Sequence, residues 1–163
     1  MYSPGNLIYF TPFYFKGDAN PKNKYLLILK ILNNNNILVS LPSSQVQIPS
    51  QYKKQFGCIE NSEDRINCFK IKANSPVTDD GWSFPKDTYL YGYYLEEYNL
   101  DMLKSVYKID TLDYEVQGAL STSIFLSIIE CFRNSAIVKR KYKRALSDQD
   151  IWMSEIGGRS DLK

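Results

Sequence analysis

The spacing of the apolar residues changes near residue 95, and this change limits the fold more than any other feature of the sequence. Before it lie short apolar runs of strand length, separated by segments rich in Asn, Gly and Pro. After it, apolar residues recur every three to four positions, as on one face of a helix. The sequence therefore predicts a single α+β domain over residues 1–146, strand-rich over 1–94 and helical over 95–146.

Five short strands are expected in the first part, and together they predict a small, curled antiparallel sheet or barrel. Four consecutive asparagines, residues 33–36, separate two of the apolar runs and favour a hairpin turn, because asparagine tolerates positive φ. A helix over residues 26–32 is the alternative. Pro12 indicates an edge strand or a bend. The expected strands cover residues 7–10, 25–29, 37–39, 65–71 and 89–93.

Two or three helices are expected in the second part. Asn99 is a suitable N-cap for a first helix, and the pair Asn134-Ser135 is expected to end a second one before a third helix within residues 136–146. Residues 147–163 are polar and are expected to form a flexible tail. The core-facing stripe of the second helix consists of Leu120, Ile124, Phe125, Ile128, Ile129 and Phe132.

The sequence contains no histidine, which excludes Ser-His and Cys-His nucleophile pairs and histidine metal sites. Its 20 basic and 18 acidic residues give a net charge of +2, which does not by itself indicate nucleic-acid binding. No metal and no cofactor are expected.

The three cysteines are Cys58, Cys68 and Cys131, and they lack the spacing of a zinc site or of a disulfide scaffold. They are expected to be reduced and mostly buried. No signal peptide and no apolar stretch of membrane-spanning length are recognisable, so a cytoplasmic location is expected.

A first candidate site joins Lys24 with Ser43 and Ser44. If the two strands pair through the asparagine turn, the start of the first strand lies beside the end of the second. A cation beside a hydroxyl can hold a phosphate and stabilise charge on its oxygens. The simpler interpretation is a surface lysine next to a serine-bearing turn.

A second candidate is the basic run that surrounds Tyr142, which can follow a phosphate backbone and stack a base. The alternative is a solvated helix face near a helix C-terminus, where cations are also favourable. We assign six basic residues to RNA binding: Lys139, Arg140, Lys141, Lys143 and Arg144 of this run, and Lys22.

Tyrosine is the third feature, with 13 in the chain and a concentration between residues 89 and 98. Tyrosine is frequent at protein interfaces and is also a good strand residue, so an interface and a half-buried sheet face both stay open. The tyrosines in question are Tyr89, Tyr91, Tyr93, Tyr94 and Tyr98.

The first 80 or so residues resemble the MazF/PemK toxins, which are small SH3-like barrels that cleave single-stranded RNA. Residues 4–10 are similar to the family's opening strand, and residues 24–29 stand where members carry Arg-Pro before an apolar strand. Residues 38–45 resemble the family's apolar strand, proline and hydroxyl pair, and residues 60–71 a later strand. The resemblance implies a small, partly open SH3-like barrel followed by C-terminal helices.

In that family an arginine and a Ser/Thr assist attack of the ribose 2′-hydroxyl on the adjacent phosphate. Carried over, Lys24 is the cation and Ser44 the hydroxyl, with Ser43 as second choice. The chain departs from the family pattern in having lysine for arginine, Tyr25 for proline and serine for threonine.

The resemblance implies a toxin-like, RNA-contacting protein that acts as a metal-independent endoribonuclease. It also implies single-stranded RNA, a small antitoxin and a second copy of the chain (a homodimer) as partners. The alternative function is a non-catalytic SH3-like module that binds a protein through a tyrosine-rich face.

Overall fold

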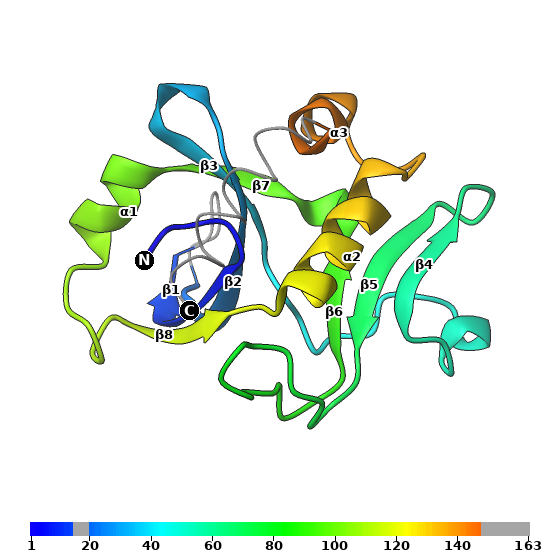
Figure 1. Cartoon of the computed structure of the whole chain (residues 1–163), viewed down its shortest axis with the longest axis horizontal. Helices are drawn as coiled ribbons and strands as arrows, with labels where there is room; N and C mark the ends of the chain where they lie inside the picture. The colour runs from blue at the N-terminus through cyan, green and yellow to red at the C-terminus, as the bar shows by residue number, and fades with distance from the viewer. Residues whose placement is uncertain (15–19, 148–163) are drawn as a thin grey trace.

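The computed structural model describes residues 1–14 and 20–147, which form a mixed α+β structure. In this part, eight strands form two antiparallel sheets and three α-helices follow or interrupt them (Figure 1). The larger sheet has the order β7-β3-β2-β1-β8, and the smaller has the order β4-β5-β6. The larger sheet contains β1 (Asn6–Phe13), β2 (Lys22–Ile31), β3 (Asn36–Ser40), β7 (Glu96–Asn99) and β8 (Tyr114–Ala119). The smaller contains β4 (Gly57–Asn61), β5 (Ile66–Ile71) and β6 (Thr88–Tyr91), and the helices are α1 (Leu100–Val106), α2 (Thr122–Arg133) and α3 (Arg140–Leu146).

The predicted α+β class with C-terminal helices is confirmed, but the described strands do not close into a barrel. The SH3-like architecture stays a prediction. The expected tail lies outside the described residues except for Ser147. No helix in the described part of the chain is long and apolar enough to span a membrane.

The asparagine turn forms as predicted, and the alternative helix over residues 26–32 is wrong. Strands β2 and β3 pair in antiparallel register, with Leu27 opposite Ser40. Asn34 and Asn35 have φ values of 63° and 61°. This left-handed conformation is accessible to asparagine at lower cost than to most other non-glycine residues, so the run of four supplies the turn without glycine.

The predicted helices are present, with shifted ends. The Asn99 side chain accepts a hydrogen bond from the Met102 N–H at 3.2 Å and caps α1 as expected. Helix α2 ends at Arg133, with Asn134 as its C-cap, and four residues of the predicted stripe are buried on it: Phe125, Ile128, Ile129 and Phe132. Ile124 is half-buried, and Leu120 is buried but precedes the helix. Helix α3 begins at Arg140 rather than near residue 136.

Three strands were not predicted, and two of them lie in the part expected to be helical. Strands β7 and β8 form the two edges of the larger sheet, and β4 is an edge of the smaller one. Pro12 lies in β1, an interior strand, so the edge interpretation is wrong. The bend interpretation fits better, because the β1–β2 register shifts between Phe10 and Phe13.

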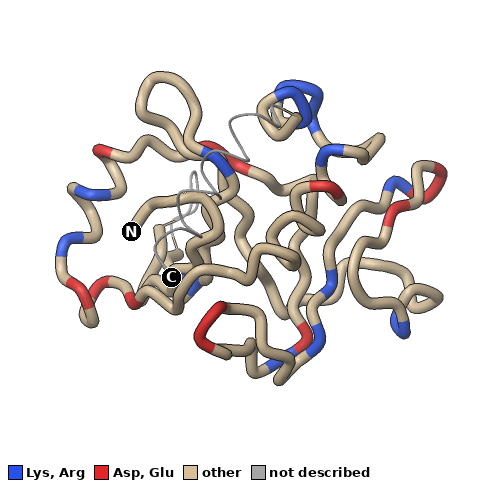
Figure 2. The backbone as a smooth tube through the Cα atoms, viewed as in Figure 1, with Lys and Arg blue, Asp and Glu red and all other residues tan. Residues whose placement is uncertain are grey.

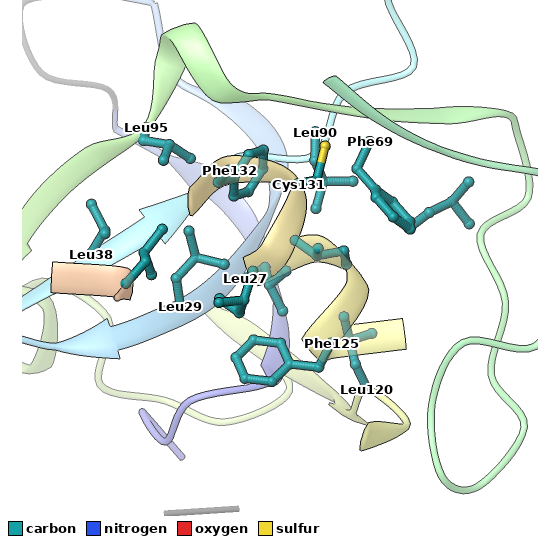
Figure 3. Packing of buried hydrophobic residues seen from close by; sticks show 14 of the residues in the cluster. Leu27, Leu29, Leu38, Phe69, Leu90, Leu95, Leu120, Phe125, Cys131 and Phe132 are labelled. Carbon is teal, nitrogen blue, oxygen red and sulfur yellow. The ribbon is translucent and has the colours of Figure 1, made fainter. Parts of the chain in front are cut away.

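The larger sheet is covered on both faces. One face packs against α2, which also contacts the smaller sheet, so this helix lies between the two sheets (Figures 1 and 3). Leu27, Leu29 and Leu38 meet Phe125 and Phe132 of α2 there. The other face carries a second cluster, in which Phe10, Phe13 and Tyr98 pack with Leu103 of α1 and Tyr107.

Two of the cysteines form a disulfide, so the expectation that all three are reduced is wrong. Cys58 of β4 is bonded to Cys131 of α2, with a Cα–Cα distance of 5.5 Å. Cys58 is exposed, whereas Cys131 is buried. Cys68 is a free thiol, and burial raises its pKa to about 11. The disulfide therefore ties the edge of the smaller sheet to the central helix.

Candidate functional site

A cavity of about 610 Å³ opens where the two sheets meet. Beyond β3 the chain crosses to β6, and the Ser43 N–H donates to the Tyr89 carbonyl at 3.0 Å while the Tyr89 N–H donates back at 2.7 Å. The cavity lies along this crossing. We call it the lysine cavity, after Lys22, Lys24 and Lys86, which line it.

The lysine cavity carries more positive than negative charge among its described lining residues. The side chains of the three lysines have no hydrogen-bond or ion-pair partner within residues 1–14 and 20–147. The described lining contains one carboxylate, Glu96, which already accepts a hydrogen bond from the Tyr98 hydroxyl at 2.9 Å. The cavity therefore suits an anion.

Lys24 is half-buried at the start of β2, opposite Phe10 of β1. Burial, and secondarily the charge of Lys22, lower the pKa of Lys24 from its ordinary value. Each effect penalises the ammonium form in the absence of a ligand, and an anion beside the ammonium would offset both.

The two candidate serines line the same cavity as Lys24. The register that pairs Leu27 with Ser40 would bring Ser43 opposite Lys24 if it continued, although the Ser43 backbone pairs with β6 instead. The Ser43 hydroxyl oxygen accepts from the Gln45 N–H at 3.1 Å. Ser44 is exposed, and its hydroxyl has no hydrogen bond to any described residue. Ser44 is therefore better placed than Ser43 to contact a ligand.

Aromatic rings form much of the remaining wall. The Tyr25 ring lies 4.6 Å from the Tyr9 ring and 5.0 Å from the Phe84 ring, measured between centroids. Tyr91 fixes the loop that borders the cavity, because its hydroxyl donates to the Gln45 carbonyl at 2.6 Å and accepts from the Gln47 N–H at 2.8 Å. Burial raises the pKa of Tyr91 to about 12, so this hydroxyl stays protonated near neutral pH.

The basic run lies on and just before α3 (Figure 2), and its residues are not among those that line the lysine cavity. Lys143 donates to the Ser135 carbonyl at 2.9 Å, and Lys141 lies 3.5 Å from the Glu97 carboxylate. Tyr142 is buried, so its ring is not available to stack a base. The exposed members of this run, Lys139, Arg140, Lys141 and Arg144, fit a solvated helix face. Lys22 is the one predicted RNA-binding residue that joins the catalytic candidates.

The five tyrosines do not share one face. Tyr89 and Tyr91 are buried in the smaller sheet, with parallel rings 5.7 Å apart. Tyr98 belongs to β7 of the larger sheet and is buried in the second cluster. Tyr93 and Tyr94 follow β6 in a 3-10 turn and are 69% and 52% exposed.

Sequence reasoning missed Lys86, Tyr9 and Phe84 as members of the cavity. Tyr9 lies in β1 directly opposite Tyr25 of β2, in the same sheet. Lys86 and Phe84 come from the segment before β6, and only the packing of one sheet against the other brings these two to β2. The proline before Lys86 was the one local sign of a turn at this place.

No protein-family model matches the chain, and no curated protein matches it either.

Proposed function

We propose that the protein is a toxin-like, RNA-contacting protein of the MazF/PemK kind, and that the lysine cavity holds a backbone phosphate of single-stranded RNA. The observation that carries this proposal is the lining of the cavity by Lys22, Lys24 and Lys86, whose ammonium groups have no partner in the described part of the chain.

The chemistry of the wall fits this ligand better than it fits a simple anion. Hydrogen bonds from ammonium groups to phosphate oxygens are charge-assisted and stronger than neutral ones. Tyr9 and Tyr25, which are both half-buried, offer aromatic surface next to the lysines, and bases of single-stranded nucleic acid stack on such rings.

We further propose that the bound RNA is cleaved without a metal ion. The ribose 2′-oxygen attacks the adjacent phosphorus, and the bond from phosphorus to the 5′-oxygen breaks. The 2′-hydroxyl proton passes to solvent, and the 5′-oxygen takes one from solvent. Lys24 stabilises the charge on the phosphate oxygens, and Ser44 donates a hydrogen bond to one of them. The products are a 2′,3′-cyclic phosphate and a 5′-hydroxyl.

The other partners belong to the same proposal. A small antitoxin and a second copy of the chain are implied by the resemblance alone. RNA as ligand also implies a cytoplasmic location. In that compartment, cellular thiols would reduce the disulfide, because Cys58 is exposed.

The proposal is tested by incubating a long, mixed-sequence single-stranded RNA with the protein in EDTA. The wild type is expected to yield discrete fragments with cyclic-phosphate ends, and Lys24→Ala to yield none while staying folded. Lys104→Ala is the matched control, because Lys104 is exposed on α1 and lines no described cavity. Equal cleavage by wild type and Lys24→Ala would refute the assignment of Lys24.

A protein-binding module is the second candidate, and a separate observation favours it. Large apolar side chains are exposed by 40% or more on α1, the segment after it and β8. These side chains lie within residues 102–116, and a contiguous exposed apolar surface marks an interaction site. RNA that stays intact and unbound, together with a protein partner that is lost when these residues become polar, would favour this function. The residues are Met102, Val106, Ile109, Leu112 and Val116.

A further inference from the structure

A second cavity, of about 570 Å³, adjoins the lysine cavity. Gln47, Tyr91 and Tyr94 line both cavities, so the two share a wall. We call the second one the tyrosine pocket, because Tyr93 and Tyr94 add their exposed rings to it. Arg65 also lines it, from the turn between β4 and β5.

The two exposed rings form a fixed platform. The Tyr93 and Tyr94 rings meet edge to face with centroids 5.2 Å apart, and Tyr94 meets the buried Tyr91 in the same way at 6.0 Å. Since Tyr91 is anchored through its hydroxyl to Gln45 and Gln47, the platform is continuous with the wall of the lysine cavity.

Gly92 holds the backbone of this platform close to the rest of the protein. A Cβ at this position would lie 2.0 Å from Asn67 Oδ1 and 2.7 Å from Val138 Cγ2. Asn67 is itself fixed, because its Nδ2 donates to Glu60 Oε1 at 3.0 Å and to the Cys131 carbonyl at 3.1 Å. The tyrosine pair therefore projects from a tightly packed turn.

Arg65 supplies a cation to the tyrosine pocket. Its side chain is exposed and has neither a hydrogen bond nor an ion pair with the described residues. A strand of nucleic acid alternates bases with phosphates. Lysines in one cavity, aromatic rings at the shared wall and an arginine in the next cavity match this alternation.

We propose that the tyrosine pocket is a second nucleotide subsite, in which a base stacks on the Tyr93 ring, Tyr94 meets that ring edge to face and Arg65 holds the phosphate beyond the base. This inference rests on the proposed function, because the RNA strand must first be held in the lysine cavity. It assigns the substrate a minimum length of more than one nucleotide.

The test compares binding of adenosine 5′-monophosphate with binding of 2′-O-methyl oligoadenylates of two to six residues. The 2′-O-methyl group blocks attack by the 2′-oxygen, so binding is measured without cleavage. Wild-type affinity is expected to rise with length up to the point at which both cavities are filled. Tyr93→Leu is expected to weaken binding of the hexanucleotide about 5- to 150-fold, the range for loss of one stacked base. Arg65→Gln is expected to weaken it about threefold or more at low salt.

Matched controls are Tyr14→Leu and Lys104→Gln, which remove an exposed tyrosine and an exposed cation that line no described cavity. Thermal unfolding verifies that all variants fold. Hexanucleotide affinities of Tyr93→Leu and Arg65→Gln equal to that of the wild type would overturn the subsite. If Lys24→Gln still weakens binding in that case, the proposed function stands. A wild type that binds no oligonucleotide overturns both.

Discussion

Lys24 is the residue on which the proposed chemistry depends, and its protonation sets a pH dependence. Burial and the nearby Lys22 lower its pKa, so the folded protein releases this proton at a lower pH than the unfolded chain, whose ordinary value is 10.5. Between these two values the unfolded state binds more protons, so the contribution of Lys24 to stability rises with pH. A bound phosphate has the opposite preference, because it favours the ammonium form.

We therefore expect the affinity of the wild type for a 2′-O-methyl oligonucleotide to fall as pH rises through the lowered pKa of Lys24. The matched variant is Lys24→Arg, whose guanidinium stays charged and should remove this part of the pH dependence. Fluorescence anisotropy from about pH 7 to about pH 10 measures both. Identical pH profiles for the two proteins would mean that Lys24 does not contact the phosphate.

At the residue scale, the sequence alone predicts contacts between side chains that one local strand pairing brings together. Lys24, Ser43 and Ser44 were linked through one predicted hairpin, and all three line one cavity. The sequence does not indicate that Lys86 lines this cavity, because only the packing of the second sheet places Lys86 beside β2. Cys58 and Cys131 were likewise out of reach, since they lie 73 residues apart and nothing in their spacing indicates a pair.

Helix α1 is an element whose start depends on one side chain. Asn99 accepts from the Met102 N–H, and its own amide donates to Asn36 Oδ1 at 3.1 Å, which also links the helix to β3. We expect Asn99→Ala to lower the free energy of unfolding by about 1 kcal/mol. Asn99→Asp keeps the accepting oxygen and should lose less. Urea denaturation of the three proteins measures the difference, and equal losses in both variants would show that the cap does not stabilise the protein.

At the element scale, prediction succeeded where the pattern was strong on a buried face. Strand β2, helix α2 and the asparagine turn all carry such patterns. The missed strands are edges, which hydrogen-bond on one side only and so need no continuous apolar run. Strand β7 contains Glu96 and Glu97, and β8 is half-exposed along its length, so neither differs from a loop in composition.

The disulfide stabilises the molecule as a whole, because it joins the smaller sheet to the helix that packs on the larger one. Closing a loop of 73 residues removes conformational freedom from the unfolded chain. By the loop-entropy relation, this stabilises the folded state by up to about 4 kcal/mol.

We expect Cys58→Ser, at an exposed position, to lower the unfolding midpoint in urea. A thiol reductant should lower the midpoint of the wild type to the same value and leave that of the variant unchanged. A wild-type midpoint that does not respond to reductant at equilibrium would contradict this contribution.

The position of β1 has a consequence for synthesis of the chain. Strand β1 lies between β2, which follows it directly, and β8, which pairs Ala119 with Asn6 (Figure 1). While the ribosome is still translating the segment before Tyr114, the β1–β2 hairpin carries an open row of backbone donors and acceptors along one side. Nascent chains held on neighbouring ribosomes of one message could pair through that side. Chaperone protection is therefore most valuable before β8 emerges.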